Sequence, residues 1–414
     1  MRMEDGQGII EEEKYVPAGK YANDNGAAKL NGDGKVDLDD TSRLDKRVWI
    51  FLGKGDGSCK HQIVVSLGAP ARSIAAGDFN RDGKVDLVVT NSVGGATWHT
   101  VQVLLGNGDG TFQPPVSYIA GTEPFGIAVG DVNQDGILDL IVTNSTSNDF
   151  STLLGIGDGT FRPALTVSVG QARRPGPITI GDFNGDGRLD VAIANQGLTP
   201  ATVAIFLGRG DGTYSTASTL GVGTNPAGLA IADLNGDGQL DLIVTNRIDS
   251  KLYVFSGVGD GSFQVPQILA LPAAPIPVAT GDFDGDGKTD LILGDALIFG
   301  ATVLLNQTSM PAAILPLAGT PQSAATGAPF PIALSTGVRD GANNPLSGRA
   351  VTLAAPVSGP SGTFAGGAQG VHAVTAANGV ATAPILTANA TEGSFSVLAE
   401  GAALTTTFAL TNGN

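Results

Sequence analysis

Carboxylate and amide side chains recur at alternate positions of one short segment, and this spacing suits a hard metal ion. The segment follows the pattern D-x-[ND]-x-D-G-x-x-D, and its second copy offers Asp78, Asn80, Asp82 and Asp86, with the backbone carbonyl of Lys84. Ca²⁺ takes about six to eight oxygen ligands, and Gly at the sixth position permits the sharp turn that brings them together. Mg²⁺ suits a flexible all-protein cage less well, and one Cys with three His makes a structural zinc site a poor match.

Four further complete copies and one incomplete copy carry the same candidate ligands. The complete copies offer Asp131, Asn133, Asp135 and Asp139; Asp182, Asn184, Asp186 and Asp190; Asp233, Asn235, Asp237 and Asp241; and Asp282, Asp284, Asp286 and Asp290. In the first copy Lys29 replaces the first Asp, so Asn31, Asp33 and Asp37 are expected to form a weak site at most. The alternative is an ordinary Asn/Asp/Gly hairpin turn, but crowded acids repel one another without a cation. We therefore expect structural calcium ions.

The elements that must position these loops repeat with a period of about 51 residues. The third positions of successive copies are separated by 49, 53, 51, 51 and 49 residues. A second segment interleaves with the first, as LGKGDGSC (52–59), LGNGDGTF (105–112), LGIGDGTF (154–161), LGRGDGTY (207–214) and SGVGDGSF (256–263). Each unit also holds four short apolar runs bounded by turn residues, which are 73–76, 85–90, 101–105 and 112–119 in the second unit. Such a unit predicts one four-stranded blade of a β-propeller.

Six units predict an all-β propeller of six blades over residues 29–310. Residues 1–28 would close the ring, contribute to a seventh blade or be disordered. The first unit is degenerate, because its second strand would fall in the polar stretch LDDTSRLDK, and residues 29–40 read alone resemble a dockerin or EF-hand loop. The spacing to the next loop favours a degenerate blade.

These motifs resemble the FG-GAP/VCBS repeats of integrin-α-like propellers. The repeat unit is P-x-x-[IL]-A-x-[GA]-D-[FVL]-N-x-D-G-x-x-D-L, which residues 124–140 and 226–242 fit fully, whereas the stretches from Pro175 and Pro275 each depart from it twice. The resemblance covers about two-thirds of the chain. It implies Ca²⁺ in the loops between the first two strands of each blade, a secreted or surface location, and a role in adhesion or recognition.

Residues 311–414 differ in composition and predict a second domain, since nearly all of the net charge of −16 lies before residue 311. Runs at 331–334, 350–353, 370–375 and 395–399, with a hairpin turn at Asn378-Gly379, predict a C-terminal β-sandwich. The stretches GRAVTLAAPVSGPSGTFAGG and VTAANGVATAPILTANATEGSFSVLA resemble bacterial invasin-type immunoglobulin-like domains, which implies a spacer.

A partner is expected on the propeller face opposite the calcium loops. In a four-stranded meander the loops and the Gly-Asp-Gly turns share one face, so the segments that vary between units lie on the other, where recognition is usually located. The best candidates there are Trp98, His99, Arg173 and Arg174. Trp98 can equally be a residue that packs at a blade edge.

The composition narrows the function to a binding module. An acidic chain is unsuited to nucleic acid, a single Cys excludes an internal disulfide, and no apolar stretch is long enough for membrane insertion. His61 and His372 lack a nucleophile or recurring acid partner in the sequence, so we expect no enzyme. A calcium-stabilised extracellular module that binds a protein or a carbohydrate is favoured, with a signal for export upstream of Met1. The alternatives are a stalk fragment of a larger surface protein and the accessory propeller of a polysaccharide-active enzyme; the sequence indicates no oligomeric state.

Overall fold

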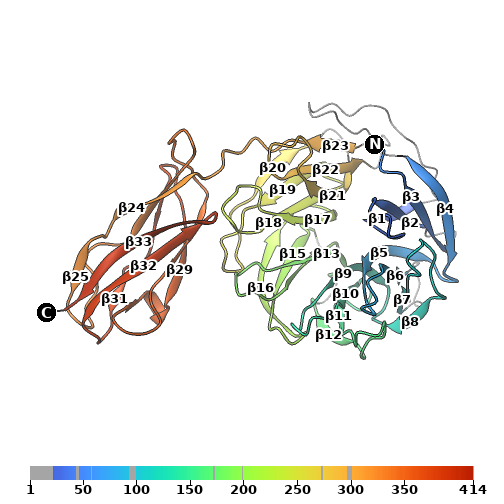
Figure 1. Ribbon diagram of the computed structural model, residues 1–414, viewed down its shortest axis with the longest axis horizontal. Coiled ribbons are helices and arrows are strands. Elements are labelled where there is room, and N and C mark those ends of the chain that lie inside the picture. Colours follow the sequence, from blue (N-terminus) through green and yellow to red (C-terminus); the bar gives the residue numbers. More distant parts are fainter. Residues whose placement is uncertain are drawn as a thin grey trace.

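The computed structural model describes residues 22–42, 46–56, 58–92, 99–170, 173–197, 199–271, 274–295 and 301–413. Within these ranges the chain is all β apart from one 3-10 turn at Ala365–Gly367. A ring of sheets precedes a separate β-sandwich, and a short linker joins the two (Figure 1). No helix in the described part of the chain has the length and apolar character that crossing a bilayer requires.

Six antiparallel sheets form the ring, each running from an inner first strand to an outer last strand. They are β1 (Ala22–Ala28), β2 (Asp37–Ser42), β3 (Arg47–Gly53) and β4 (Cys59–Ser66); β5 (Ala71–Gly77), β6 (Asp86–Asn91), β7 (Thr100–Leu104) and β8 (Val116–Ile119); β9 (Pro124–Gly130), β10 (Asp139–Asn144), β11 (Asp149–Leu153) and β12 (Leu165–Ser168); β13 (Pro175–Gly181), β14 (Asp190–Asn195), β15 (Thr202–Gly208) and β16 (Tyr214–Gly221); β17 (Pro226–Ala232), β18 (Asp241–Asn246), β19 (Lys251–Phe255) and β20 (Gln267–Ala270); and β21 (Pro275–Gly281), β22 (Asp290–Asp295) and β23 (Ala301–Leu304). The first strands of successive sheets contact one another in order from β1 to β21. The predicted propeller is confirmed, with six blades among the described residues.

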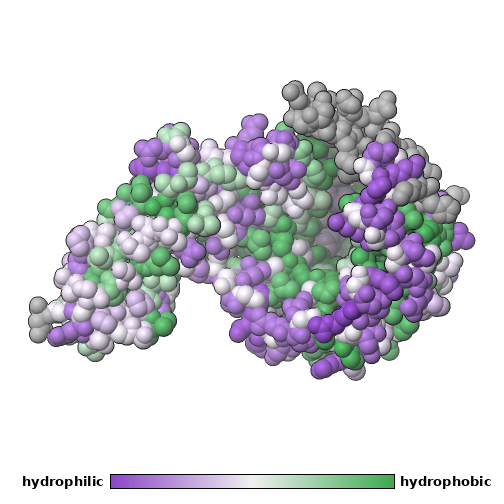
Figure 2. Space-filling model, in the orientation of Figure 1, coloured by the Kyte–Doolittle hydropathy of each residue, from purple (hydrophilic) through white to green (hydrophobic). Residues whose placement is uncertain are grey.

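The second strand of a blade is buried on both faces. Every residue of β6, β10, β14 and β18 is buried, because alternate side chains point to opposite neighbouring blades. In β6, Leu87 and Val89 pack against the first blade, whereas Val88 packs against the third. This two-sided burial explains why the strands are almost continuous apolar runs. Figure 2 shows hydrophilic side chains over the outer rim and hydrophobic ones on the walls of a central hollow.

A threonine in the second strand joins most blades to the next. The Thr143 hydroxyl donates a hydrogen bond to the backbone carbonyl of Gly176 at 2.7 Å and accepts one from the Gly126 N–H at 2.9 Å. Thr90 and Thr245 donate to carbonyl oxygens of the following blade at 2.9 and 2.8 Å. Ala194 takes this position in the fourth blade, so its side chain makes no such bond.

The first blade is built from an unusually polar sequence. Residues 37–42 form β2, which pairs with both β1 and β3. Asp39 and Asp40 are buried in this strand, where Val88 and Val89 stand in the second blade. The interpretation of this unit as a degenerate blade is therefore confirmed, and β1 begins seven residues before the boundary that we expect at residue 29.

The C-terminal part is a sandwich of two main sheets. Its strands are β24 (Ala313–Ala318), β26 (Ser335–Arg339) and β30 (Val380–Thr382) in one sheet; β25 (Gln322–Ala324), β33 (Leu404–Asn412), β32 (Gly393–Gly401), β27 (Ala350–Ala354) and β29 (Gly370–Val374) in the other; and a short pair, β28 (Gly362–Thr363) and β31 (Thr387–Ala388). Phe330, Val351, Val397 and Phe408 lie in the core between the sheets, each at most 1% exposed.

Two details of the predicted sandwich are wrong. Residues 331–334 form no strand, and the chain enters β26 only at Ser335. The turn at Asn378-Gly379 exists, with Gly379 at a φ of 73°, but it joins β29 to β30 in the other sheet and is not a hairpin.

Candidate functional site

The nine-residue loops between the first and second strands fold around their own acidic side chains. In the second loop the Asp78 carboxylate accepts backbone N–H bonds from Asp82 at 3.1 Å and Gly83 at 2.9 Å. The Asn80 amide oxygen accepts from Asp82 N–H at 3.0 Å, and the Asp82 carboxylate accepts from Lys84 N–H at 2.9 Å. Backbone donors therefore turn the candidate ligands toward the inside of one small loop, and each carboxylate oxygen has further lone pairs for a cation.

The ninth residue of each loop ties it to the end of the third strand. The Asp139 carboxylate is fully buried, and its two oxygens accept N–H bonds from Val132 at 3.0 Å and Gly155 at 2.8 Å. The same pair of bonds is made by Asp37, Asp86, Asp190, Asp241 and Asp290. This Asp holds the blade together in addition to being a candidate ligand.

The candidate ligands converge most clearly in the sixth loop. One carboxylate oxygen each from Asp282, Asp284 and Asp290 lies within 4.8 Å of the other two, and no other group of three acidic, His or Cys side chains in the described ranges does so. The second to fifth loops have Asn at the third position, whose amide oxygen would supply the corresponding ligand. An all-oxygen set gathered at this spacing fits Ca²⁺.

The backbone is left-handed at the fourth as well as the sixth position of these loops, which the sequence pattern did not reveal. Gly occupies the fourth position in four loops, but Arg81 and Gln134 adopt a φ of 61° there. Their side chains donate to the carbonyls of Gly136 and Gly187 in the next loop, at 3.3 and 3.0 Å. These bonds connect the second, third and fourth loops along one face of the ring.

The ninth-position Asp of the first loop makes the same two hydrogen bonds as its counterparts, but this loop has fewer candidate ligands. Asp37 binds the N–H groups of Leu30 and Gly53 at 2.9 and 2.8 Å, as its counterparts do. Asn31 accepts from the Asp33 N–H at 3.0 Å, but Lys29 stands at the first position. The loop thus has the scaffold of the others without the first carboxylate.

Burial and mutual repulsion raise the pKa of acids in the second to fifth loops. The pKa of Asp139 and of Asp190 is raised to about 6, mainly by burial and further by the two other carboxylates of each loop. The same causes raise the pKa of Asp241 to about 7, and burial raises that of Asp237 to about 6. A bound cation would oppose these shifts, since it favours the ionised form of its ligands.

The Gly-Asp-Gly turns lie on the same face as the loops and lock adjacent blades. Asp158 accepts from both the backbone N–H and the hydroxyl of Thr160, at 2.9 and 2.5 Å, which shapes the turn. Gly159 donates its N–H to the carbonyl of Phe79 in the preceding blade at 3.0 Å, and the rings of Phe79 and Phe161 meet edge to face at 5.7 Å. The predicted association of both motifs on one face is confirmed.

The opposite rim carries the candidate ligand-binding residues. Trp98 lies outside the described residues, and His99 is half-buried immediately before β7. Arg174 is exposed, and its backbone N–H donates to the Asn148 amide oxygen at 2.9 Å. The variable segments of the third and fourth blades therefore contact each other on this rim.

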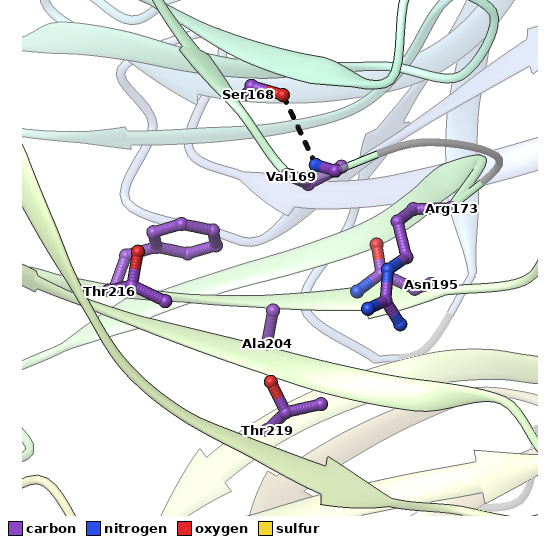
Figure 3. A pocket seen from close by; sticks show the side chains of 9 residues that line it. Ser168, Val169, Arg173, Asn195, Ala204, Thr216 and Thr219 are labelled. Atoms are coloured by element: carbon purple, nitrogen blue, oxygen red, sulfur yellow. Dashed lines mark hydrogen bonds between the residues drawn. The ribbon is translucent and has the colours of Figure 1, made fainter.

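Arg173 lines a cavity of about 330 Å³ between the third and fourth blades. Figure 3 shows its guanidinium beside Asn195, with Thr216 and Thr219 across the space. Asn195 is 1% exposed, and its amide oxygen has no hydrogen-bond partner among the described residues. The Arg173 guanidinium likewise makes no hydrogen bond or ion pair within that part of the chain. The cavity thus offers a donor, an acceptor and the apolar ring of Phe206. Only Arg173 was expected from the sequence, because Asn195 matches the Asn that ends the second strand in each of the second to fifth blades.

Comparisons with known proteins agree with this architecture. The family model described as FG-GAP-like repeat matches residues 29–89, 92–142, 131–193, 182–244 and 233–293, and the FG-GAP repeat model matches residues 71–111. A comparison with curated proteins gives no significant match.

Three solved structures are similar to this chain at low sequence identity. A protein from Lactobacillus plantarum is 14% identical over 72% of this chain and 87% of its own, with a TM-score of 0.50. BBS1N in complex with ARL6DN is 14% identical, covering 89% and 92% of the two chains with a TM-score of 0.46. A functionally unknown protein from Desulfotomaculum acetoxidans is also 14% identical, covering 84% and 97% with a TM-score of 0.44. The repeat model matches more than half of the chain, and the structure has six antiparallel sheets in its ring. The chain therefore belongs to the FG-GAP-like repeat proteins, as a β-propeller module of the adhesion and recognition kind.

Proposed function

We propose that this chain is an exported, non-enzymatic binding module whose propeller is stabilised by Ca²⁺. In this proposal the propeller recognises a protein or a glycan through the face opposite the calcium loops. The C-terminal sandwich acts as a spacer, as its resemblance to invasin-type domains suggests. The observation that carries the proposal is the division of the ring into two faces. One face is repeated and rich in acids; the other is variable and has polar groups that lack a partner among the described residues.

The calcium part rests on the loops. Three carboxylates of the sixth loop approach within 4.8 Å, and buried acids of the third and fourth loops have a raised pKa because burial and neighbouring acids oppose their charge. Asp at the first, fifth and ninth positions and Asn or Asp at the third would hold the ion, with the carbonyl of the seventh. The ion would neutralise these charges and join the loop to the blade, so its role is structural.

The recognition part rests on the cavity beside Arg173. A guanidinium binds carboxylate or sulfate groups well, hydroxyl groups of a ligand can donate to the Asn195 amide oxygen, and an apolar ring packs against the C–H face of a sugar. This set of groups fits an acidic saccharide or an acidic peptide side chain. Exposed loops on a rigid ring are also the usual location of recognition.

The test is binding of the full chain to glycan and matrix-protein arrays, with Ca²⁺ and with chelator. Replacing Arg173 by Ala should weaken binding at least about tenfold, which corresponds to the loss of one charge-assisted contact. Arg209→Ala is the matched control, because Arg209 is exposed in a Gly-Asp-Gly turn on the other face. Equal loss in both variants would contradict the proposed face. A chain that binds nothing on either array would instead favour the stalk.

A further inference from the structure

The fifth loop differs from the other complete loops in its burial. Its fifth-position acid, Asp237, is 1% exposed, and Asn235 is 6% exposed. The acids at the same position in the other four complete loops are all exposed: Asp82, Asp135, Asp186 and Asp286. Among the complete loops, only the fifth is therefore covered by another part of the chain.

The C-terminal sandwich is what covers it. The Ala350 N–H, at the start of β27, donates to the Asp237 carboxylate at 2.8 Å, and the Ala402 N–H donates to the Asp237 carbonyl at 2.7 Å. Ala402 lies in the tight turn between β32 and β33, whose tip is directed at the fifth blade in Figure 1. Gln264 of the propeller also donates to the Gly348 carbonyl, at 3.2 Å. Asp237 is thus bound by two separate elements of the other domain.

The fifth loop has an uncharged residue at its seventh position, and this allows Asp237 to be buried beneath the sandwich. In the second, fourth and sixth loops a basic residue at the seventh position pairs with the fifth-position acid, as Lys84 does with Asp82 at 3.2 Å. The fifth loop has Gln239 there instead. A Lys or Arg at this position would have to be desolvated beneath the sandwich, which is costly. Gln239 leaves the second oxygen of Asp237 open to the Ala350 N–H.

The buried joint has an unbalanced charge. Arg349 is 9% exposed, and its guanidinium donates to the Ser309 carbonyl of the linker at 3.0 Å. This guanidinium also interacts electrostatically with Asp233, Asp237 and Asp241 of the fifth loop. When all three acids are ionised, three carboxylates and one guanidinium leave two negative charges, which one divalent cation would cancel. The Asn235 amide nitrogen lies 3.5 Å from Asp241, inside the loop, and its amide oxygen has no hydrogen-bond partner among the described residues. A cation would give that oxygen a partner.

We propose that the fifth loop is a cation-dependent joint, in which one divalent ion fixes the sandwich against the propeller. The inference rests on the calcium sites of the proposed function. Without the ion, the buried carboxylates repel one another and favour exposure to water, so the sandwich undocks and the linker at residues 305–312 allows it to move. Ions in the other complete loops leave the domain arrangement unchanged, because their fifth-position acids remain exposed.

Small-angle X-ray scattering of the full chain, with Ca²⁺ as the probe, tests the joint. The radius of gyration and the maximum dimension should both increase on chelation. Asp237→Asn should bind one ion fewer by isothermal titration calorimetry and scatter as the extended form even in Ca²⁺. Asp135→Asn is the matched control, since it changes the same position of the exposed third loop and should stay compact.

A second variant tests the contact between the two domains without changing any ligand of the fifth loop. Ala350→Pro removes the N–H donor at the first residue of β27, where Pro is tolerated, and leaves every loop ligand in place. We expect it to bind as many ions as the unmodified chain and to be extended. If the unmodified chain binds Ca²⁺ but scatters identically after chelation, the joint is refuted and the calcium proposal stands. If it binds no Ca²⁺, the calcium proposal itself fails.

Discussion

Without calcium, the chain should lose stability as the pH rises from about 4 to about 7. Asp139 and Asp190 are fully buried, and the pKa of each is raised to about 6, from 3.8 in the absence of burial. The folded state therefore binds these protons more tightly than the unfolded state does. Below pH 3.8 both states are protonated and no penalty exists; between there and about pH 6 the unfolded state ionises first, so stability falls.

The expected loss is large compared with the stability of a domain. A shift of one pKa unit corresponds to about 1.4 kcal/mol, so each of these carboxylates costs on the order of 2 to 3 kcal/mol at neutral pH. Native domains are stable by about 5 to 15 kcal/mol in total. Added Ca²⁺ should reverse most of the loss, because it stabilises the ionised loops.

Urea unfolding in chelator, at several values between about pH 4.5 and about pH 7.5, measures this effect. Asp139→Asn removes one titrating group, so its stability relative to the unmodified chain should rise across this range. Asp158→Asn is the control: hydrogen bonds from Thr160 lower the pKa of the exposed Asp158, so its contribution changes only below the range. A constant difference between Asp139→Asn and the unmodified chain would refute the reasoning.

Two further substitutions test the packing of the ring by urea unfolding. Thr143→Val should cost about 1 to 3 kcal/mol, because the Gly126 N–H and the Gly176 carbonyl lose a buried partner, whereas Thr160→Val at an exposed turn should cost less. An equal loss in both would contradict the role of the inter-blade bond. Gly159→Ala should destabilise more than Gly68→Ala: both have positive φ (85° and 71°), but only at Gly159 would a Cβ lie 2.9 Å from a side-chain atom, of Leu105. The reverse order would contradict the close approach.

The sequence predicted the ring and its acidic loops because both are local properties repeated six times. In the second to fifth blades the second strands are almost continuous apolar runs, since both of their faces are buried. In a four-stranded meander the first and third connections lie at the same end of the strands, so the loops and the Gly-Asp-Gly turns share one face. The left-handed fourth position was missed because Arg81 and Gln134 hide the glycine pattern there.

The features that escaped the sequence depend on contacts between distant segments. The one local signal that Ala350 covers Asp237 is Gln239, which stands at a position that is basic in four of the six loops. The prediction of a strand at 331–334 was wrong because an apolar run does not by itself show that a segment pairs with a neighbouring strand. Pro331 has no N–H to donate, and Phe330 and Leu334 enter the core from a segment outside the sheets.

Calorimetric titration of the full chain with Ca²⁺ tests the central claim most directly. The claim predicts binding at the five complete loops, with weaker or no binding at the first, and an unfolding temperature that rises with Ca²⁺ and falls with chelator. At a hundredfold excess over its dissociation constant, each ion should add about 2.7 kcal/mol. A chain that releases no heat on titration and unfolds at the same temperature in Ca²⁺ and in chelator would contradict the account.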